Sequence, residues 1–217
     1  MSKTEEVVAD RRAVLTGAMA LSLSACAGNL IGPPSPAAAL YVLRPEFGPV
    51  SGGSPVRQQL VVAVPAAPAA LDTERIALER GVDVMDYYAQ SQWTDRLPLV
   101  VQSLLVEGFE KSGQVAAVAR EGAGIRADVV LETELRQFEA YYAVPDTAPE
   151  IRITLVAKLV GVTNRNVIDT MEVSRTARAS ANNLQSVIAA FTLAGGEALK
   201  DTVRWAIADL SSRRAGA

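Results

Sequence analysis

Apolar and polar residues alternate along two stretches of the chain. In residues 128–136 the odd-numbered positions are largely apolar, whereas most even-numbered positions are charged. Residues 151–159 repeat the pattern, with isoleucine, leucine and alanine set against arginine, threonine and lysine. Successive side chains of a strand point to opposite faces, so a period of two predicts two long, half-buried strands. The polar face of the resulting sheet meets water or a partner.

Shorter apolar runs predict further strands. The run at 60–64 is continuous and bounded by Pro65, which is typical of a central strand covered on both faces. Turn residues predict two hairpins, one with Gly81 between strands and one through Asn164-Arg165-Asn166. The remaining predicted strands are 40–43, stopped by Pro45, then 75–78, 82–88, 115–118 and 167–179.

Helical spacing of apolar residues predicts two main helices. The first starts near Trp93, with Asp95 as its cap and Pro98 in its first turn, and it ends at Gly113. The second runs from Asn183 to about Ser212, with Asn182 as its N-cap. Two glycines, 195 and 196, interrupt it, which indicates either a kink or a close approach of the helix to the sheet; close packing is favoured.

These elements together predict one α+β domain over residues 40–212. Its fold is a single mixed/antiparallel β-sheet packed against two main α-helices.

Composition removes several classes of function. The chain has no histidine, one cysteine and a net charge of −3. Histidine-dependent catalysis, multi-cysteine metal cages and intramolecular disulfides are therefore excluded, and the sequence predicts no metal site. A weakly acidic chain without a basic block is also a poor candidate for binding nucleic acid.

The N-terminal residues predict a lipid anchor. Arg11 and Arg12 precede the apolar run 13–23, which is too short to span a bilayer. The run ends in Leu23, Ser24, Ala25 and Cys26, a tetrapeptide that resembles the bacterial lipobox. We therefore expect residues 1–25 to be a cleaved signal peptide, with diacylglycerol and N-acyl lipid on Cys26. The plain alternative is that Cys26 is a free thiol at the end of a helix.

The segment after the cut predicts a tether and a destination. Residues 26–39 carry three prolines among small residues and read as an extended linker. Ala27 is not the aspartate that retains enteric lipoproteins in the inner membrane, so we expect the periplasmic face of the outer membrane. The inner membrane stays an alternative. Both ordinary and twin-arginine export fit the two arginines.

Tyrosines are the candidate partner contacts. Tyr87 and Tyr88 lie close to Trp93, and Tyr141 and Tyr142 lie near a proline-bounded loop. Tyrosine and tryptophan are enriched at interfaces, but they also fill cores. Trp93 is expected in the core. Tyr87 and Tyr88 must point to opposite faces of a regular strand, so at most one of them can be buried.

Three carboxylates, Glu132, Glu134 and Glu139, could suggest acid–base chemistry. Glu132 and Glu134 share one strand face with Arg136, which favours a solvated sheet surface instead. The glycine-rich stretches match no phosphate loop, so any ATPase must be another chain.

Six short motifs follow the lipobox in order over residues 40–210. They are Tyr-x-Leu at 41–43, an apolar strand ending in proline at 61–65, Leu-Asp-x-x-Arg-Ile at 71–76, Tyr-Tyr-x-x-x-x-Trp at 87–93, Leu-x-x-Glu-Leu-x-x-Phe-Glu at 131–139 and Val-x-x-Ala-Phe at 187–191. Their order resembles the ABC-type transport auxiliary lipoproteins, a family that includes the paraquat-inducible lipoprotein.

This resemblance implies a non-enzymatic, lipid-anchored accessory component of a lipid-transport system. Its partners would be a mammalian-cell-entry (MCE) domain protein and an ABC permease and ATPase, and no cofactor is expected. Two alternatives remain: a periplasmic lipid-binding carrier, and a lipoprotein that assists assembly of an outer-membrane complex. The oligomeric state stays open, a homo-oligomer included.

Overall fold

The computed structural model describes residues 37–50, 55–81 and 84–212. Every helix and strand described belongs to one compact unit, residues 38–217. The elements in chain order are β1 (Ala39–Tyr41), β2 (Val56–Val62), β3 (Arg75–Arg80), β4 (Val84–Trp93), α2 (Leu97–Ser112), β5 (Val115–Arg120), β6 (Val129–Tyr142), β7 (Glu150–Gly161), β8 (Val167–Arg178) and α3 (Leu184–Ser212).

The long strand β6 holds the eight-stranded sheet together. One edge of β6 pairs antiparallel with β7 from Val129 to Tyr141, and β7 pairs in turn with β8. The other edge is divided: its first residues pair in parallel with β2, and its last residues, 140–142, pair in parallel with β3. Strand β5 extends the sheet beyond β2, whereas β4 and β1 extend it beyond β3.

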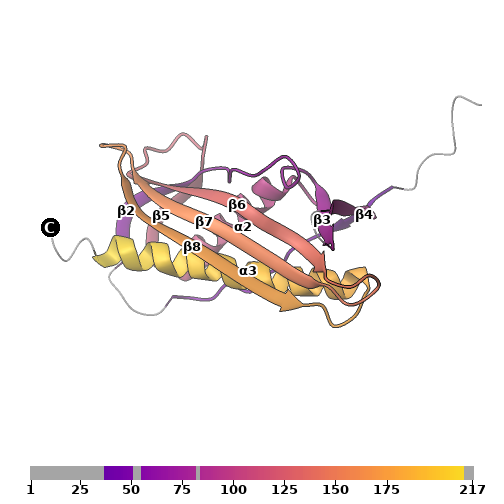
Figure 1. The fold of residues 1–217 in the computed structure, drawn as a ribbon. Helices are drawn as coiled ribbons and strands as arrows, with labels where there is room; N and C mark the ends of the chain where they lie inside the picture. The colour runs from indigo at the N-terminus through magenta and orange to yellow at the C-terminus, as the bar shows by residue number, and fades with distance from the viewer. Residues whose placement is uncertain (1–36, 51–54, 82–83, 213–217) are drawn as a thin grey trace, which may run out of the picture. The chain divides into compact units, whose positions relative to one another are not determined.

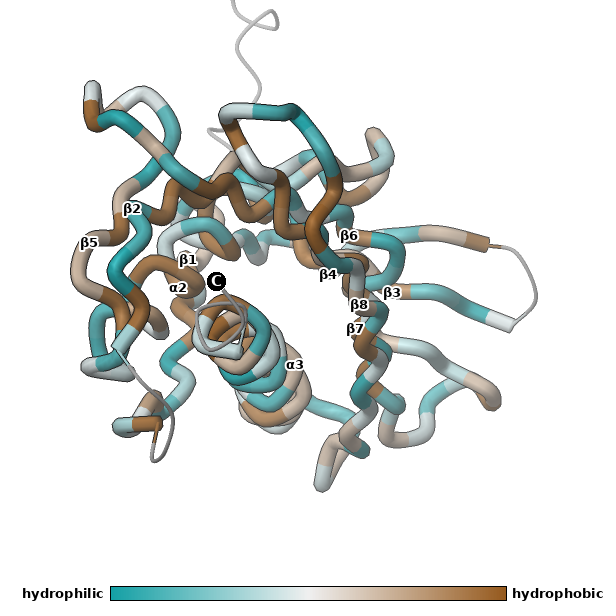
Figure 2. The backbone as a smooth tube through the Cα atoms, turned by 90° about the vertical axis from the view of Figure 1, so that its left-hand side faces the viewer, coloured by the Kyte–Doolittle hydropathy of each residue, from teal (hydrophilic) through white to brown (hydrophobic). Residues whose placement is uncertain are grey.

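The sheet curls around α3. In Figure 1 the strands β6–β8 run side by side along the helix. Figure 2 shows α3 nearly end-on, with β6–β8 on one side and α2, β2 and β5 on the other. In β6 the side chains of Val129, Leu131 and Leu135 are buried, whereas those of Glu132 and Glu134, which lie between them in the sequence, are exposed. The predicted alternation and the predicted α+β class, a mixed sheet with two main helices, are both confirmed.

An aromatic cluster forms the centre of the core. Trp93, Phe138 and Phe191 are each no more than 2% exposed. Trp93 meets the other two rings edge-on at 6.2 and 5.3 Å, and the rings of Phe138 and Phe191 stack at 5.4 Å. Such contacts add to the free energy of burial. The expectation that Trp93 lies in the core is confirmed.

The helix starts differ from prediction. Trp93 is the last residue of β4, and α2 begins only at Leu97, whose N–H donates to the Thr73 carbonyl (3.0 Å). Asp95 therefore does not cap the helix; its carboxylate accepts the N–H of Arg96. Pro98 lies in the first turn and Gly113 ends the helix at φ +66°, as predicted.

The cap of α3 is one residue later than predicted. The Asn183 side chain accepts the Ser186 N–H at 2.9 Å, which is the N-cap interaction. The side-chain oxygen of Asn182 instead accepts a hydrogen bond from the Tyr142 hydroxyl. Neither α2 nor α3, the helices of the described residues, has the length and apolarity that crossing a bilayer requires.

Strand limits also differ from prediction. Strand β2 begins at Val56 and ends at Val62, although the apolar run continues to Val64. It lies between β5 and β6, so its predicted central place is confirmed. Strand β6 extends to Tyr142, six residues past the predicted limit, because β3 supplies a partner that local pattern does not reveal.

The paired glycines of α3 lie in an unbroken helix. A Cβ on Gly196 would lie 2.9 Å from Cβ of Pro45, closer than real carbon atoms approach. A Cβ on Gly195 would lie 3.6 Å from Phe138, an ordinary van der Waals distance. The predicted close packing therefore applies to Gly196, but its neighbour is the segment after β1 rather than the sheet.

This contrast gives a matched pair of variants. Gly195→Ala gains helix propensity without a clash, so we expect its free energy of unfolding to rise by about 0.5–1 kcal/mol. Gly196→Ala must displace the rigid Pro45 ring, and we expect a net loss of about 1–2 kcal/mol. Urea unfolding of both variants measures the difference. Equal effects of the two substitutions would contradict the close contact with Pro45.

Candidate functional site

The predicted lipidation site lies outside the described residues. Leu23, Ser24, Ala25 and Cys26 all belong to the first 36 residues, and their roles stay predictions. The predicted partner contacts, in contrast, lie within the described part of the chain.

Three of the four predicted tyrosines line one groove. The hollow has a volume of about 770 Å³ and lies where the β3–β4 hairpin meets the end of β6. We call it the tyrosine groove. Its lining includes Tyr87, Tyr88 and Tyr142, together with Arg75, Arg80, Asp86, Asp146 and Asn182.

A hydrogen-bond relay crosses the tyrosine groove. The Tyr142 hydroxyl donates to Oδ1 of Asn182 at 3.0 Å and lies 2.8 Å from the Tyr88 hydroxyl. Since the single proton of Tyr142 goes to Asn182, Tyr88 is the donor to Tyr142. Burial, reinforced by the hydrogen bond to Tyr142, raises the pKa of Tyr88 well above its usual value. Tyr88 is therefore a neutral phenol at any physiological pH.

Tyr87 is fixed by a second set of contacts. Its hydroxyl donates to the Ala70 carbonyl at 3.1 Å, and the Arg75 guanidinium lies 3.6 Å above the ring centre. Among the residues that the structure describes, no carboxylate forms an ion pair with Arg75. Arg80, by comparison, faces Asp86 at 3.5 Å. The stacked Arg75 thus presents a guanidinium of fixed orientation that no described carboxylate pairs with.

A bulge in β4 brings the adjacent tyrosines to the same groove. Pairing with β3 stops after Tyr87 and resumes at Gln92, so residues 88–91 form an irregular stretch. Gln90 within it has φ +52°, a conformation that a regular strand excludes. Both tyrosines are half-buried and both line the groove, so the prediction that at most one of them is buried holds.

Tyr141 does not line the tyrosine groove. The guanidinium of Arg152 lies 3.4 Å above its ring, and Arg152 also pairs with Glu150 at 3.1 Å. In the β3–β6 ladder Tyr141 is opposite Glu79 and Tyr142 is opposite Arg80. The two tyrosines therefore leave β6 on opposite faces.

Sequence reasoning missed the polar partners of the tyrosines. Arg75 and Arg80 belong to the predicted hairpin, and Asn182 was assigned as a helix cap. The bulge in β4 and the pairing of β3 with β6 bring these residues together, and neither feature can be recognised from the local order of apolar and polar residues.

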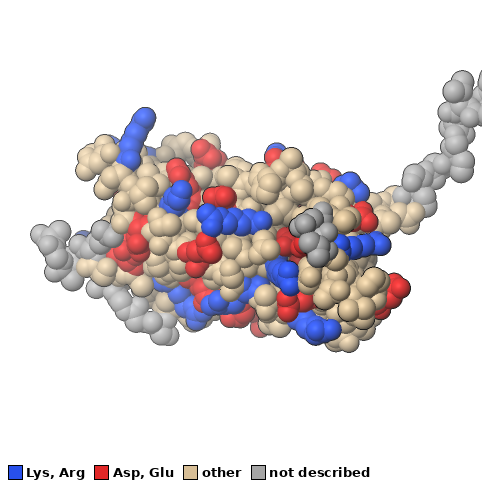
Figure 3. All heavy atoms as spheres, viewed as in Figure 1, with Lys and Arg blue, Asp and Glu red and all other residues tan. Residues whose placement is uncertain are grey.

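The outer face of β6–β8 is a solvated surface of mixed charge. Glu132 and Glu134 are exposed, as predicted, and Arg136 bridges Glu134 at 3.6 Å and Glu172 at 2.5 Å. Figure 3 shows acidic and basic side chains interspersed over this face. Ion pairs between such exposed groups contribute little to stability.

Glu139 is the exception among the three predicted carboxylates. It is 3% exposed, and its carboxylate accepts the Phe138 N–H at 2.6 Å. The register between β6 and β7 shifts after Leu135, where β6 has a bulge. From Ala140 onward β6 also pairs with β3. The solvated face of β6 therefore ends before Glu139. Burial, helped by the nearby Glu79 carboxylate, raises the pKa of Glu139 to about 7.

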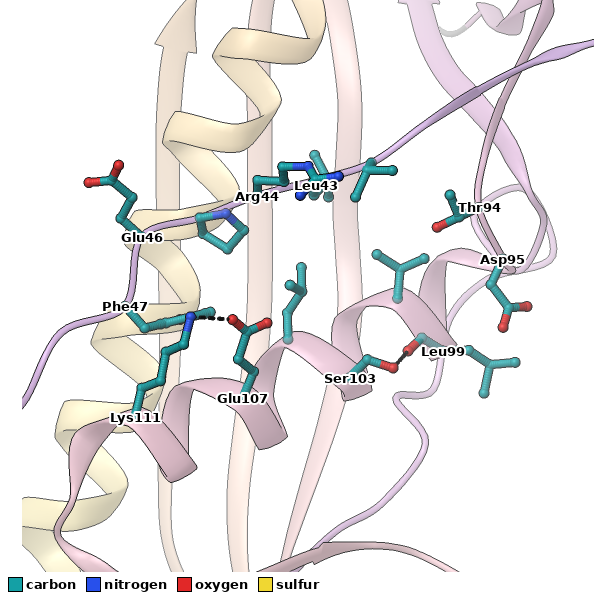
Figure 4. Close-up of a pocket in the computed structure, with 14 residues that line it drawn as sticks. Leu43, Arg44, Glu46, Phe47, Thr94, Asp95, Leu99, Ser103, Glu107 and Lys111 are labelled. Atoms are coloured by element: carbon teal, nitrogen blue, oxygen red, sulfur yellow. Dashed lines mark hydrogen bonds and ion pairs between the residues drawn. The ribbon is translucent and has the colours of Figure 1, made fainter.

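A second hollow lies beside α2 and has a volume of about 850 Å³. Figure 4 shows the segment from Leu43 to Phe47 on one side and α2 on the other, with Leu99, Ser103, Glu107 and Lys111 along the helix. Lys111 pairs with Glu107 at 2.6 Å, and Ser103 donates to the Leu99 carbonyl. Half of the lining is charged or polar, so this hollow offers an apolar ligand only a partial surface.

No group of three or more carboxylates or cysteines within the described ranges could hold a metal ion. The tyrosine groove offers aromatic surface, the Arg75 guanidinium, which no described carboxylate pairs with, and a relay of hydroxyl and amide groups.

Comparison with known proteins identifies the family. The model of the "ABC-type transport auxiliary lipoprotein component" family matches residues 41–204. A crystal structure of a Xanthomonas campestris protein of the DUF330 family is similar, with TM-score 0.76 and 27% identity over 83% of this chain and all of that one. Comparison with curated proteins finds no match.

Two further structures are less similar. An uncharacterized protein has TM-score 0.59 and 12% identity, covering 77% of this chain and 97% of its own. A PelC dodecamer from Paraburkholderia phytofirmans has TM-score 0.48 and 14% identity, covering 77% and 95%.

Glu139 makes the stability of the protein depend on pH. Between about pH 4.5 and 7 the native carboxyl retains a proton that the unfolded chain has lost, so the free energy of unfolding falls as pH rises through this window. Glu139→Gln keeps the hydrogen-bond acceptor and removes the titration. We expect it to be more stable than the wild type at pH 8 by on the order of 2 kcal/mol, with little difference at pH 5.

Urea unfolding at the two pH values measures this effect, and Glu132→Gln on the exposed face is the control. The account of Glu139 is wrong when Glu139→Gln and Glu132→Gln show the same pH dependence.

Proposed function

We propose a function from one established premise: the chain belongs to the family of ABC-type transport auxiliary lipoprotein components. The protein is a non-enzymatic accessory component of an ABC transport system that moves lipids or other hydrophobic molecules across the cell envelope. Its lipid anchor holds it at a membrane, and its tyrosine groove contacts the transport partner, an MCE-domain protein.

The family match is the observation that carries the proposal. It begins at Tyr41, the last residue of β1, and ends at Arg204, within α3, so it includes β2–β8, α2, most of α3 and all the tyrosines of the groove. The family is defined by an auxiliary role in transport and not by a reaction. This agrees with a groove whose groups can bind a partner but are not arranged as nucleophile and base.

The anchor is proposed at Cys26. Two or three acyl chains on one residue hold a domain at a membrane, whereas one chain alone binds only reversibly. Fully extended, the stretch from Cys26 to Ala39 spans at most about 45 Å, which sets the distance from the membrane at which the domain can work. We place the anchor in the outer membrane, facing the periplasm.

The tyrosine groove is the proposed contact for the partner. Tyr87, Tyr88 and Tyr142 are held by hydrogen bonds in the free protein, so binding does not need to order them. Side chains that are rigid before binding contribute more to affinity because less conformational entropy is lost. Tyrosine is also among the residues that dominate interface energetics.

The carrier alternative would place a lipid between sheet and helices. At the level of Trp93, Phe138 and Phe191 that space is filled by packed rings. The hollow beside α2 is open and half polar. Both observations favour the accessory role. Stoichiometric lipid in mass spectra of the purified protein would favour the carrier.

Photo-crosslinking in membranes tests the partner contact. We expect benzoylphenylalanine at Tyr88 to capture an MCE-domain protein, identified by mass spectrometry. The same residue at Tyr141 is the matched control, because it lies on the same sheet but outside the groove. Capture from position 141 and not from position 88 would contradict the proposed surface.

Metabolic labelling with palmitate tests the anchor. We expect the wild type to be labelled and Cys26→Ser to be unlabelled, to keep its signal peptide and to lose the crosslink from position 88. An unlabelled wild type would overturn the anchor.

A further inference from the structure

The β3–β4 hairpin is attached to β6 by a short set of contacts, which we call the hairpin joint. Residues 78–80 of β3 pair with residues 140–142 of β6. The Gly81 N–H donates to the Tyr142 carbonyl at 3.1 Å, and the Tyr88 hydroxyl donates to the Tyr142 hydroxyl at 2.8 Å. The other edge of β6, by comparison, pairs with β7 along nearly its whole length.

The tyrosine groove spans the hairpin joint. Tyr87 and Tyr88 line it from the hairpin, and Tyr142 lines it from β6. The groove therefore keeps its shape while the joint is closed and comes apart when the joint opens. Short pairings of this kind open at a lower free energy than the central strands of a sheet.

A buried carboxylate lies beside the hairpin joint. Glu139 directly precedes Ala140, where the pairing with β3 begins, and it is 3% exposed. Within the joint Glu79 is opposite Tyr141. Residues two apart on a strand project to the same face, so Glu139 and Glu79 lie on one face of the sheet. The charge of Glu79 acts on Glu139 across the joint.

Burial has the largest effect on Glu139 and raises its pKa to about 7. The Phe138 N–H, which the carboxylate accepts at 2.6 Å, lowers this pKa. The Glu79 carboxylate of β3 raises it, whereas the Arg152 guanidinium of β7 and the Gln137 side chain lower it. These groups act on Glu139 from its own strand and from both neighbouring strands.

We propose that the protonation of Glu139 controls the hairpin joint: the neutral side chain keeps β3 on β6, and the ionised one releases the hairpin. An ionised Glu139 is repelled by Glu79 and is costly to keep out of water, and lifting β3 away relieves both effects. The tyrosine groove is then intact at low pH and disrupted at high pH. The consequence for a partner rests on the proposed function, whereas the opening of the joint does not.

The sign follows from the two environments of the carboxylate. In the closed joint the pKa of Glu139 is about 7, and in the open joint it returns toward the ordinary value of 4.5. Between these values the closed joint retains a proton that the open joint has lost. The closed form is therefore favoured at low pH, and this preference is lost as pH rises through about 7.

Amide hydrogen exchange of the full-length protein in detergent, without a partner, tests the inference. The Gly81 N–H reports on the joint because it donates to Tyr142. After correction for the intrinsic exchange rate, we expect its protection to fall at least about tenfold from about pH 5.5 to about pH 8. The Gly161 N–H, which donates to the Asn166 carbonyl at 3.0 Å at the β7–β8 turn, is the control and should not change.

Three variants assign the effect to Glu139. Glu139→Gln keeps an acceptor for the Phe138 N–H but does not titrate, so the protection of Gly81 should no longer depend on pH. Glu79→Gln removes the repulsion and should reduce the fold-change. Glu132→Gln, on the exposed face of the same strand, should behave as the wild type does.

A constant protection of Gly81 in the wild type contradicts the inference, even when Glu139→Gln does not fold. The same holds when Gly81 is protected as strongly as the central amides of β7, because the joint then opens only with the whole domain. The crosslink from position 88 is a separate test. Capture of a partner at neither pH counts against the proposed function and leaves the joint unaffected, whereas equal capture at both values counts against control by the joint.

Discussion

The contact of Trp93, Phe138 and Phe191 is the interaction on which the rest of the structure depends. It joins the end of β4, the middle of β6 and the first half of α3, which are far apart in the chain. Each aromatic side chain removes a large apolar area from water, so loss of one would cost about 3–5 kcal/mol. Because Trp93 ends β4, the cluster fixes one end of the strand that carries the proposed site.

The two ends of β4 have different environments. At Trp93 the strand is buried and pairs with β1, whereas at Val84 it is exposed and pairs, among the described strands, with β3 alone. The bulge at residues 88–91 separates these parts and directs Tyr88 to Tyr142. A rigid core thus supports the strand that carries the tyrosines of the groove, which suits the proposed role of holding a partner.

Local patterns predicted the α+β class, the alternating faces of β6 and β7, and the C-terminal ends of α2 and α3. They failed where the structure depends on distant residues. The first N–H of α2, that of Leu97, is satisfied by the Thr73 carbonyl and not by the side chain of Asp95. Strand β6 continues past its predicted end, where it pairs with β3. The tyrosines were recognisable as candidates, but Arg75 and Asn182 were not, because parallel pairing and the β4 bulge bring them together.

Amide hydrogen exchange of the full-length protein tests the central claim most directly. The measurement compares the protein in its native membranes with the protein after removal of the transport partner. The account predicts that the partner slows exchange at Met85–Ala89 and leaves the segment 42–47 unchanged. Slower exchange at 42–47 and α2, with β4 unaffected, would contradict it.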